Sequence, residues 1–163
     1  MSRINRASKF FVLCATMLVS GCATLGPVYT PATSVPADKA TVYVYRESGI
    51  FGGAVAYTVS ANGVPISTLP AGGYFTYFAS PGEVELSAKT EAKTSVTIDA
   101  HAGETYYVKG TVGIGFFVGH PHLVIVPKEV GEKEIVTCKL VPPSNSTKSG
   151  QLELRRQSHI ARS

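Results

Sequence analysis

The sequence predicts an all-β fold, a single antiparallel β-sandwich of about seven to eight short strands over residues 39–141. Short runs rich in β-branched and aromatic residues recur along this region, and turn residues such as Asn62-Gly63 separate them. No stretch has the length and period of a helix that would connect two parallel strands. A region of roughly 100 residues is large enough for one hydrophobic core.

Each of these runs is assigned a strand. In ATVYVYR, Val42 and Val44 are expected on one face and the two tyrosines on the other, because successive side chains of a strand alternate. Asn62-Gly63 supplies the two positive-φ residues of a type I′ turn and predicts a hairpin, in which Pro65 belongs at an edge or a bulge. The other strands are expected in GGYFTYFA, GEVELSAK, TSVTIDA, ETYYVKG, HLVIVP and EIVTCKLV.

Residues 1–21 have the layout of a secretory signal. Arg3, Arg6 and Lys9 precede an apolar run from Phe10 to Val19. A membrane-spanning helix needs about 20 apolar residues to cross roughly 30 Å of hydrocarbon, and this run is about half that long. The run is therefore predicted to be a signal peptide and not a spanning helix.

The signal ends in Val19-Ser20-Gly21-Cys22, which resembles the lipobox of bacterial lipoproteins. The resemblance implies that Cys22 is the lipid attachment site, because a thiolate forms a stable thioether with diacylglycerol. The alternative is a buried core cysteine at the end of a helix. Two or more acyl chains hold a protein firmly to a bilayer. Ala23 is not the aspartate that retains enteric lipoproteins in the inner membrane, which implies the outer membrane of the cell envelope.

The flanking segments complete the division into domains. Residues 22–38 contain Pro27, Pro31 and Pro36 and predict a linker behind the lipidated cysteine. Pro-rich chain extends about 3.1 Å per residue, so this linker could hold the domain up to roughly 50 Å from the bilayer. Residues 142–163 are polar and basic, and disorder is expected there, with contact to anionic lipid or glycan as the alternative.

The charge pattern argues against nucleic acid as a partner. Of the net charge of +4, the part belonging to residues 1–21 is +3. Residues 39–141 contain eight Lys/Arg and nine Asp/Glu, so the domain lacks a basic nucleic-acid-binding surface. The glycines of GTVGIGFFVG are spaced G-x-G-x-x-x-G instead of G-x-G-x-x-G, and a His-Pro follows them. No cofactor is therefore expected.

Cys138 is the cysteine that is left once the signal is removed and Cys22 is acylated. Val136, Cys138 and Leu140 would alternate onto one face of the strand expected in EIVTCKLV, which predicts a buried core thiol. A lone thiol in an oxidising compartment could instead be a reactive nucleophile or form an intermolecular bridge.

Two longer motifs resemble a known family. AKTEAKTSVTI and AGETYYVKGTVGIGFFVGHPHLVIV are similar to the domain of unknown function 2846, and the resemblance extends from about Ala40 to Leu140. Proteins of this family are typically bacterial lipoproteins, which agrees with Cys22, and the family brings no assigned activity and no catalytic residues. The order of NG, an aromatic strand and PG also resembles the small PEGA-type β-sandwich.

Two residue pairs are weighed as binding sites. His120 and His122 would face the same side of a strand, as a metal pair requires, but zinc usually takes three or four protein ligands and no other lies nearby in the sequence. Surface or turn histidines are the alternative. Phe116 and Phe117, in the Gly-rich segment 110–119, could form an adhesive patch for a partner or lipid, whether that segment is a bulged strand or a loop.

No catalytic constellation is found. The sequence contains neither G-x-S-x-G nor H-E-x-x-H. Glu83 and Glu85 share a strand face as a glycosidase pair would, but they alternate with apolar residues as on any solvated sheet. Exposed tyrosines could stack on sugars, and about half of them are expected in the core. The tyrosines considered are Tyr43, Tyr45, Tyr57, Tyr74, Tyr77, Tyr106 and Tyr107.

The expected function is therefore a non-catalytic binding or scaffolding role in the bacterial cell envelope, with the chain anchored by lipid on Cys22. Two alternatives stay open. One is a periplasmic metal-dependent factor or enzyme that uses His120 and His122. The other is a carrier of an apolar ligand between the sheets, with Phe116 and Phe117 at its mouth. The partner would be an envelope protein or a glycan.

Overall fold

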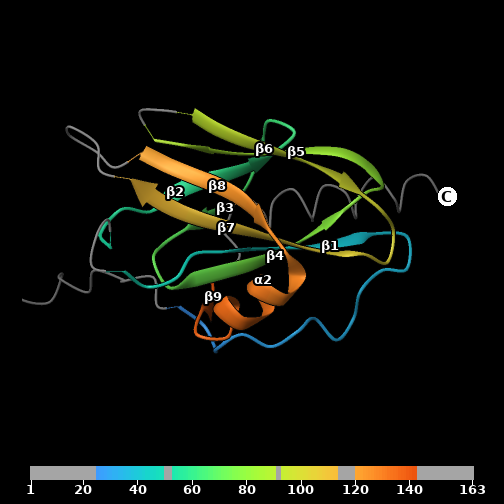
Figure 1. Ribbon diagram of the computed structural model, residues 1–163, viewed down its shortest axis with the longest axis horizontal. Coiled ribbons are helices and arrows are strands. Elements are labelled where there is room, and N and C mark those ends of the chain that lie inside the picture. The colour runs from blue at the N-terminus through green and yellow to red at the C-terminus, as the bar shows by residue number, and fades with distance from the viewer. Residues whose placement is uncertain (1–24, 50–52, 91–92, 114–119, 143–163) are drawn as a thin grey trace, which may run out of the picture.

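The computed structural model describes residues 25–49, 53–90, 93–113 and 120–142 (Figure 1). The predictions made for Cys22, for Phe116 and Phe117, and for the tail beyond residue 142 lie outside these ranges. Within the ranges the chain forms nine strands and one short helix, which confirms the all-β expectation. In this part of the chain, no helix is both long enough and apolar enough to cross a membrane.

The strands form two sheets that pack face to face. The bounds are β1 Ala40–Tyr45, β2 Tyr57–Ala61, β3 Val64–Leu69, β4 Gly73–Ala79, β5 Gly82–Lys89, β6 Lys93–Ala100, β7 Thr105–Gly113, β8 His120–Val126 and β9 Lys139–Leu140. One sheet has the order β8-β7-β1-β4-β9, and the other has the order β3-β2-β5-β6. We call them the five-stranded and the four-stranded sheet.

The main core lies between the two sheets. Val42 and Val44 of β1 are fully buried there, together with Val59 of β2 and Leu86 of β5. The expected alternation along β1 is thus confirmed. Full burial of one such side chain contributes about 1.5–3 kcal/mol, so this layer is the largest source of stabilisation.

The hairpin expected at Asn62-Gly63 is present. Asn62 and Gly63 have φ values of 48° and 80°, as a type I′ turn requires. Pro65 lies on β3, an edge strand, and the β2–β3 register shifts between Val59 and Ser60, next to the residue that faces it. Because proline has no N–H to donate to a neighbouring strand, both the edge and the irregular register accommodate it.

The five-stranded sheet is mixed, whereas a purely antiparallel sandwich was expected. β1 pairs antiparallel with β4 but parallel with β7, and β9 pairs parallel with β4. The chain changes sheets four times between β1 and β7: after β1, after β3, after β4 and after β6. β1 and β7 are therefore joined through the other sheet, and no tight hairpin imposes antiparallel pairing on them.

The outer face of the five-stranded sheet is buried as well. All six residues of β1 are buried, because a third layer covers its tyrosines. This layer consists of helix α2, Lys128–Ile135, and the segment 25–38, which runs beside it (Figure 1). The side chains enclosed here, which we call the tyrosine layer, are Tyr29, Tyr43, Tyr45, Tyr74, Tyr107, Ile135 and Cys138.

Helix α2 was not expected from the sequence, and the strand predicted in EIVTCKLV is shortened to two residues. Ile135 ends the helix, Val136 follows it with 50% exposure, and only Lys139–Leu140 is strand. Gly131 and Ile135 are four residues apart and therefore lie on the same side of the helix. Both are buried, so this side faces the sheet. Cys138 is fully buried, as predicted, but its place is in the tyrosine layer and not on a strand.

The start of the described chain adds a short bridge to the edge of the five-stranded sheet. Val28 pairs antiparallel with Lys139, and the backbone N of Gly26 donates to the carbonyl of Leu140 at 2.7 Å. Tyr29 then enters the tyrosine layer. The predicted spacer of roughly 50 Å is therefore wrong for its described part, because backbone hydrogen bonds and ring burial hold that part against the domain.

A side chain at position 131 should push α2 away from the sheet. A Cβ on Gly131 would overlap the ring of Tyr107, which is buried. We expect Gly131→Ala to lower the free energy of unfolding by about 1–3 kcal/mol, the range for overpacking, although alanine favours helix more than glycine does. Urea denaturation measures the change. Val130→Ala, at the exposed neighbour, should shift it by less than about 0.5 kcal/mol. Equal effects of both substitutions would contradict this packing.

Candidate functional site

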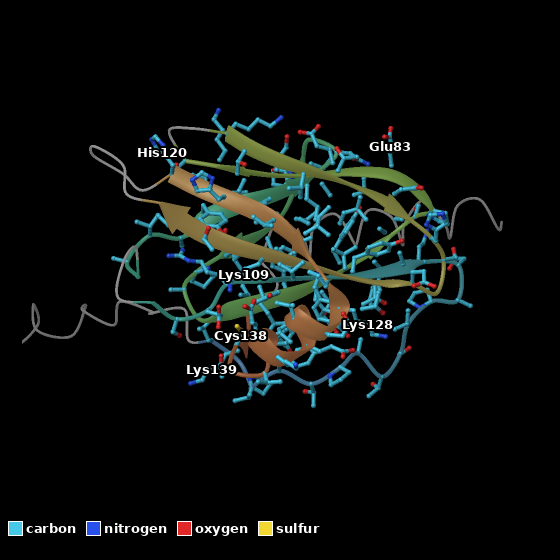
Figure 2. The ribbon with its side chains drawn as sticks, in the orientation of Figure 1. Glu83, Lys109, His120, Lys128, Cys138 and Lys139 are labelled. Carbon is cyan, nitrogen blue, oxygen red and sulfur yellow. The ribbon has the colours of Figure 1, made fainter. Side chains whose placement is uncertain are left out.

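An open groove of about 530 Å³ lies between α2, the segment 25–38 and the beginnings of β1 and β7. The buried rings of Tyr43 and Tyr107 form its floor. Lys128, labelled in Figure 2, and Glu132 border it from the helix and give it one charge of each sign. The other lining residues are Tyr29, Pro31, Ala32, Val35, Thr41, Thr105 and Val136.

Ring contacts and one backbone hydrogen bond fix the floor of the groove. Tyr43 and Tyr107 stack with their ring centroids 5.3 Å apart, and Tyr29 meets Tyr43 edge-on at the same separation. The hydroxyl of Tyr43 accepts a hydrogen bond from the backbone N of Ala32 at 2.8 Å. Burial raises the pKa of Tyr29 and Tyr107, so both hydroxyls stay protonated at neutral pH.

The tyrosines belong to the core more often than the sequence indicated. Of the seven considered, Tyr77 and Tyr106 are half-buried and none is exposed. The others are buried, either between the sheets or in the tyrosine layer. The surface for stacking is therefore limited to the parts of the rings that the groove leaves open.

Lys109 joins α2 to β7 and to the end of β1. Its Nζ lies 2.6 Å from Oε2 of Glu47 and 2.8 Å from Oε1 of Glu134. The hydroxyl of Tyr45 donates to Oε2 of Glu134 at 2.5 Å. Hydrogen bonds from Lys109 and then Tyr45 hold the pKa of Glu134 below its ordinary value. Because every group in this network is paired with another, its role is to position α2.

A second hollow, of about 310 Å³, lies beyond the end of β1 and is lined partly by Arg46. Arg46 is buried and donates through Nη1 to the carbonyl of Val55 at 2.5 Å, and its guanidinium lies 5.6 Å from the ring centroid of Tyr57. The Tyr57 hydroxyl is buried without a hydrogen-bond partner among the described residues, close to Gly110. Burial raises the pKa of Tyr57 to about 12, so this hydroxyl does not act as a base at neutral pH.

His120 and His122 lie on β8, at an edge of the five-stranded sheet, and both are exposed (Figure 2 labels His120). They face the same side, as expected from their spacing. Gly113 and Thr111 of β7 lie opposite them, and neither is a usual zinc ligand. Across the described ranges, no group of three or more His, Cys, Asp or Glu could hold a metal ion.

Glu83 and Glu85 share a face of β5 but have different surroundings. Glu85 forms an ion pair with Lys93 at 3.1 Å, and the hydrogen bond and charge of Lys93 lower the pKa of Glu85. Glu83 is exposed and lies apart from Lys128, a residue that lines the groove (Figure 2). A glycosidase pair requires one carboxyl with a raised pKa, whereas Lys93 lowers the pKa of Glu85.

The groove was not predicted from the sequence because most of its helical wall, residues 128–133, lies where no helix was expected. Signals for the helix were present: Pro127 precedes it, Glu129 lies in its first turn and Lys133 in its last, as the helix dipole favours. The groove offers aromatic rings, hydroxyls, exposed valines and two opposite charges. Because the floor rings are only 3–4% exposed, such a lining suits non-covalent binding mainly through its exposed valines and its two charges.

Replacing Glu134 should lower stability in a pH-dependent way. The folded pKa of Glu134 is lowered, so its contribution is present above the ordinary value of 4.5 and is lost as the pH falls through the lowered value. We expect Glu134→Gln to reduce the free energy of unfolding by about 1–2 kcal/mol at neutral pH, with a smaller difference in acid. Urea denaturation over a pH series checks this, with the exposed Glu129→Gln as control. A pH-independent difference would argue against the ion pair.

The comparisons with known proteins identify the family. A family model described as "Protein of unknown function (DUF2846)" matches residues 36–119, which is more than half of the chain. The match covers β1 to β7, hence most of both sheets and the tyrosines on the floor of the groove, while α2 and β9 lie outside it. No curated protein and no solved structure matches the chain. The chain therefore belongs to the DUF2846 family.

Proposed function

We propose that this chain is a lipid-anchored protein of the bacterial cell envelope that acts by binding and carries out no chemistry of its own. Its anchor is the diacylglycerol on Cys22, and Ala23 favours the outer membrane as its location. Its binding surface is the groove between α2 and the segment 25–38. The partner is an envelope protein or a glycan.

The position of Cys22 relative to the folded domain carries the proposal of an anchor. Val19-Ser20-Gly21-Cys22 ends an apolar run that is too short to span a bilayer. The described chain begins at residue 25, and its backbone hydrogen bonds to β9 begin at Gly26, four residues after Cys22. Cleavage before Cys22 therefore leaves every described residue in the mature chain.

The groove supports a binding role because apolar side chains of its lining are exposed to solvent. Val35 and Val136 are 41% and 50% exposed on opposite sides of the buried tyrosine rings. The charged network around Lys109 is occupied within the protein, whereas the groove is open to solvent. An open, aromatic-floored groove accommodates an extended peptide or a sugar chain.

Acylation is tested at Cys22 itself. In cells fed an alkynyl palmitate, the wild-type protein should take up the label and partition into detergent, and Cys22→Ala should do neither, because the substituted side chain cannot form a thioether. Cys14→Ala, which changes a thiol within the signal, is the control and should behave as the wild type. Label or membrane attachment retained by Cys22→Ala would refute the anchor.

The binding surface is tested with a photo-crosslinking amino acid in the native envelope. At Val136, in the groove, it should yield a discrete crosslinked product, because a bound partner lies against this side chain. At Val64, which is 64% exposed on the edge strand β3, it should yield none. Identical products at the two positions, or none at Val136, would remove the groove as the binding surface.

A further inference from the structure

We infer that one edge of the five-stranded sheet lies directly against the lipid headgroups of the anchoring membrane. This edge, which we call the β9 edge, consists of β9 and the residues 26–29 that pair with it. The inference rests on the proposed acylation of Cys22 and adds the orientation of the domain. In this orientation the sandwich lies on the membrane surface, whereas the linker predicted from the sequence would hold it away from the bilayer.

The tether between the lipid and the β9 edge is short. Gly26 follows Cys22 by four residues. A fully extended residue spans at most about 3.6 Å, so Gly26 lies within about 14 Å of the acylated cysteine. The headgroup region adds roughly 5–7 Å to each side of the hydrocarbon. The tether therefore leaves little room for solvent between the edge and the bilayer.

The tether cannot lengthen without damage to the fold. Gly26 donates to the carbonyl of Leu140 at 2.7 Å, and Tyr29 donates from its backbone N to the carbonyl of Cys138 at 2.9 Å. The ring of Tyr29 also meets Tyr74 edge-on, with centroids 5.1 Å apart. Peeling the segment away would break these bonds and expose the tyrosine layer, so the edge stays where the tether begins.

The side chains of the β9 edge suit a headgroup surface. Val28 is 53% exposed and pairs with Lys139, which is also exposed (Figure 2). An apolar side chain beside a lysine matches the interface of a bilayer, because the valine can enter the apolar boundary while the ammonium contacts phosphate. The edge thus presents both kinds of group that bind headgroups.

The basic tail begins at the same edge. Leu140 is bonded to Gly26, and the described chain ends two residues later at Pro142. The tail that follows contains four cations and one acid: Lys148, Arg155, Arg156, Arg162 and Glu153. Cations are attracted to anionic lipid only within about a Debye length of the surface. Because the tail starts at the membrane-facing edge, its chain length allows these cations to reach that range.

This orientation leaves the groove accessible. β9 pairs with Gly73 and Tyr74 of β4, which lie beside the end of β1, whereas the groove is lined by Thr41 near the start of β1 and by Thr105. The groove therefore adjoins the β9 edge at Tyr29 and extends away from it along the side of the domain. Glu83 lies on the opposite side of the molecule from Lys139 (Figure 2).

The test places a fluorophore at Lys139→Cys or at Glu83→Cys in the full acylated protein. The protein is reconstituted in vesicles of equal parts phosphatidylcholine and phosphatidylglycerol that contain headgroup-spin-labelled lipid as quencher. Labelling is selective because Cys138 is fully buried, and burial raises the pKa of its thiol to about 11. We expect quenching at Lys139→Cys to be several-fold stronger than at Glu83→Cys.

Two further variants test the cause. Insertion of about ten Gly/Ser residues between Ala23 and Gly26 should reduce quenching at Lys139→Cys to the level of Glu83→Cys. In the anionic vesicles, the double substitution Arg155→Gln and Arg156→Gln should weaken quenching at Lys139→Cys. Unchanged quenching would show that the tail does not contribute to the orientation. Equal quenching at the two labelled positions in acylated protein overturns the orientation but leaves the anchor. A mass spectrum without acyl chains overturns the anchor itself.

Discussion

The burial of β1 on both faces is the constraint on which the rest of the structure depends. Val42 and Val44 point into the core between the sheets, and Tyr43 and Tyr45 point the opposite way. A strand that is apolar on both faces is stable only when both are covered. The four-stranded sheet covers one face. The other needs a third layer, which the chain builds from the segment 25–38 and α2.

Tyrosine, in place of an aliphatic residue, determines how that third layer attaches. Most buried hydroxyls in folded proteins have a hydrogen-bond partner. The hydroxyl of Tyr43 accepts a hydrogen bond from the backbone N of Ala32. The hydroxyl of Tyr45 donates to the carboxylate of Glu134, which also forms an ion pair with Lys109. One hydroxyl thus bonds to the segment 25–38 and the other to α2, the two halves of the third layer. Where the two halves do not meet, the groove is left open over the rings.

The segment 25–38 connects this packing to the proposed anchor. The same residues that cover the tyrosines also end the tether from Cys22, so the stability of the outer layer and the distance of the domain from the membrane are set together. Tether, tail and β9 meet at one edge because Leu140 pairs with Gly26. The segment 25–38 therefore contributes both to the groove and to the β9 edge, the two surfaces for which we propose contacts.

Local chemistry alone determined much of this protein. Alternating residues predicted the first eight strands. The tendency of Asn-Gly to adopt positive φ predicted the hairpin at Asn62-Gly63, and the missing N–H of proline predicted the edge position of Pro65. Each of these depends on neighbours within a few positions. The burial of Cys138 was also predicted, although from a strand that the chain does not form there.

Only the tertiary structure decided the parallel pairing of β1 with β7, the helix α2 and the docking of the segment 25–38. Isolated, the eight residues of α2 are too few for a stable helix in water, and three prolines favour an extended, solvated segment. Both are held by contacts with tyrosines distant in the sequence. Local sequence therefore determined the strands and turns, whereas the outer layer and its groove depend on long-range burial of a second apolar face.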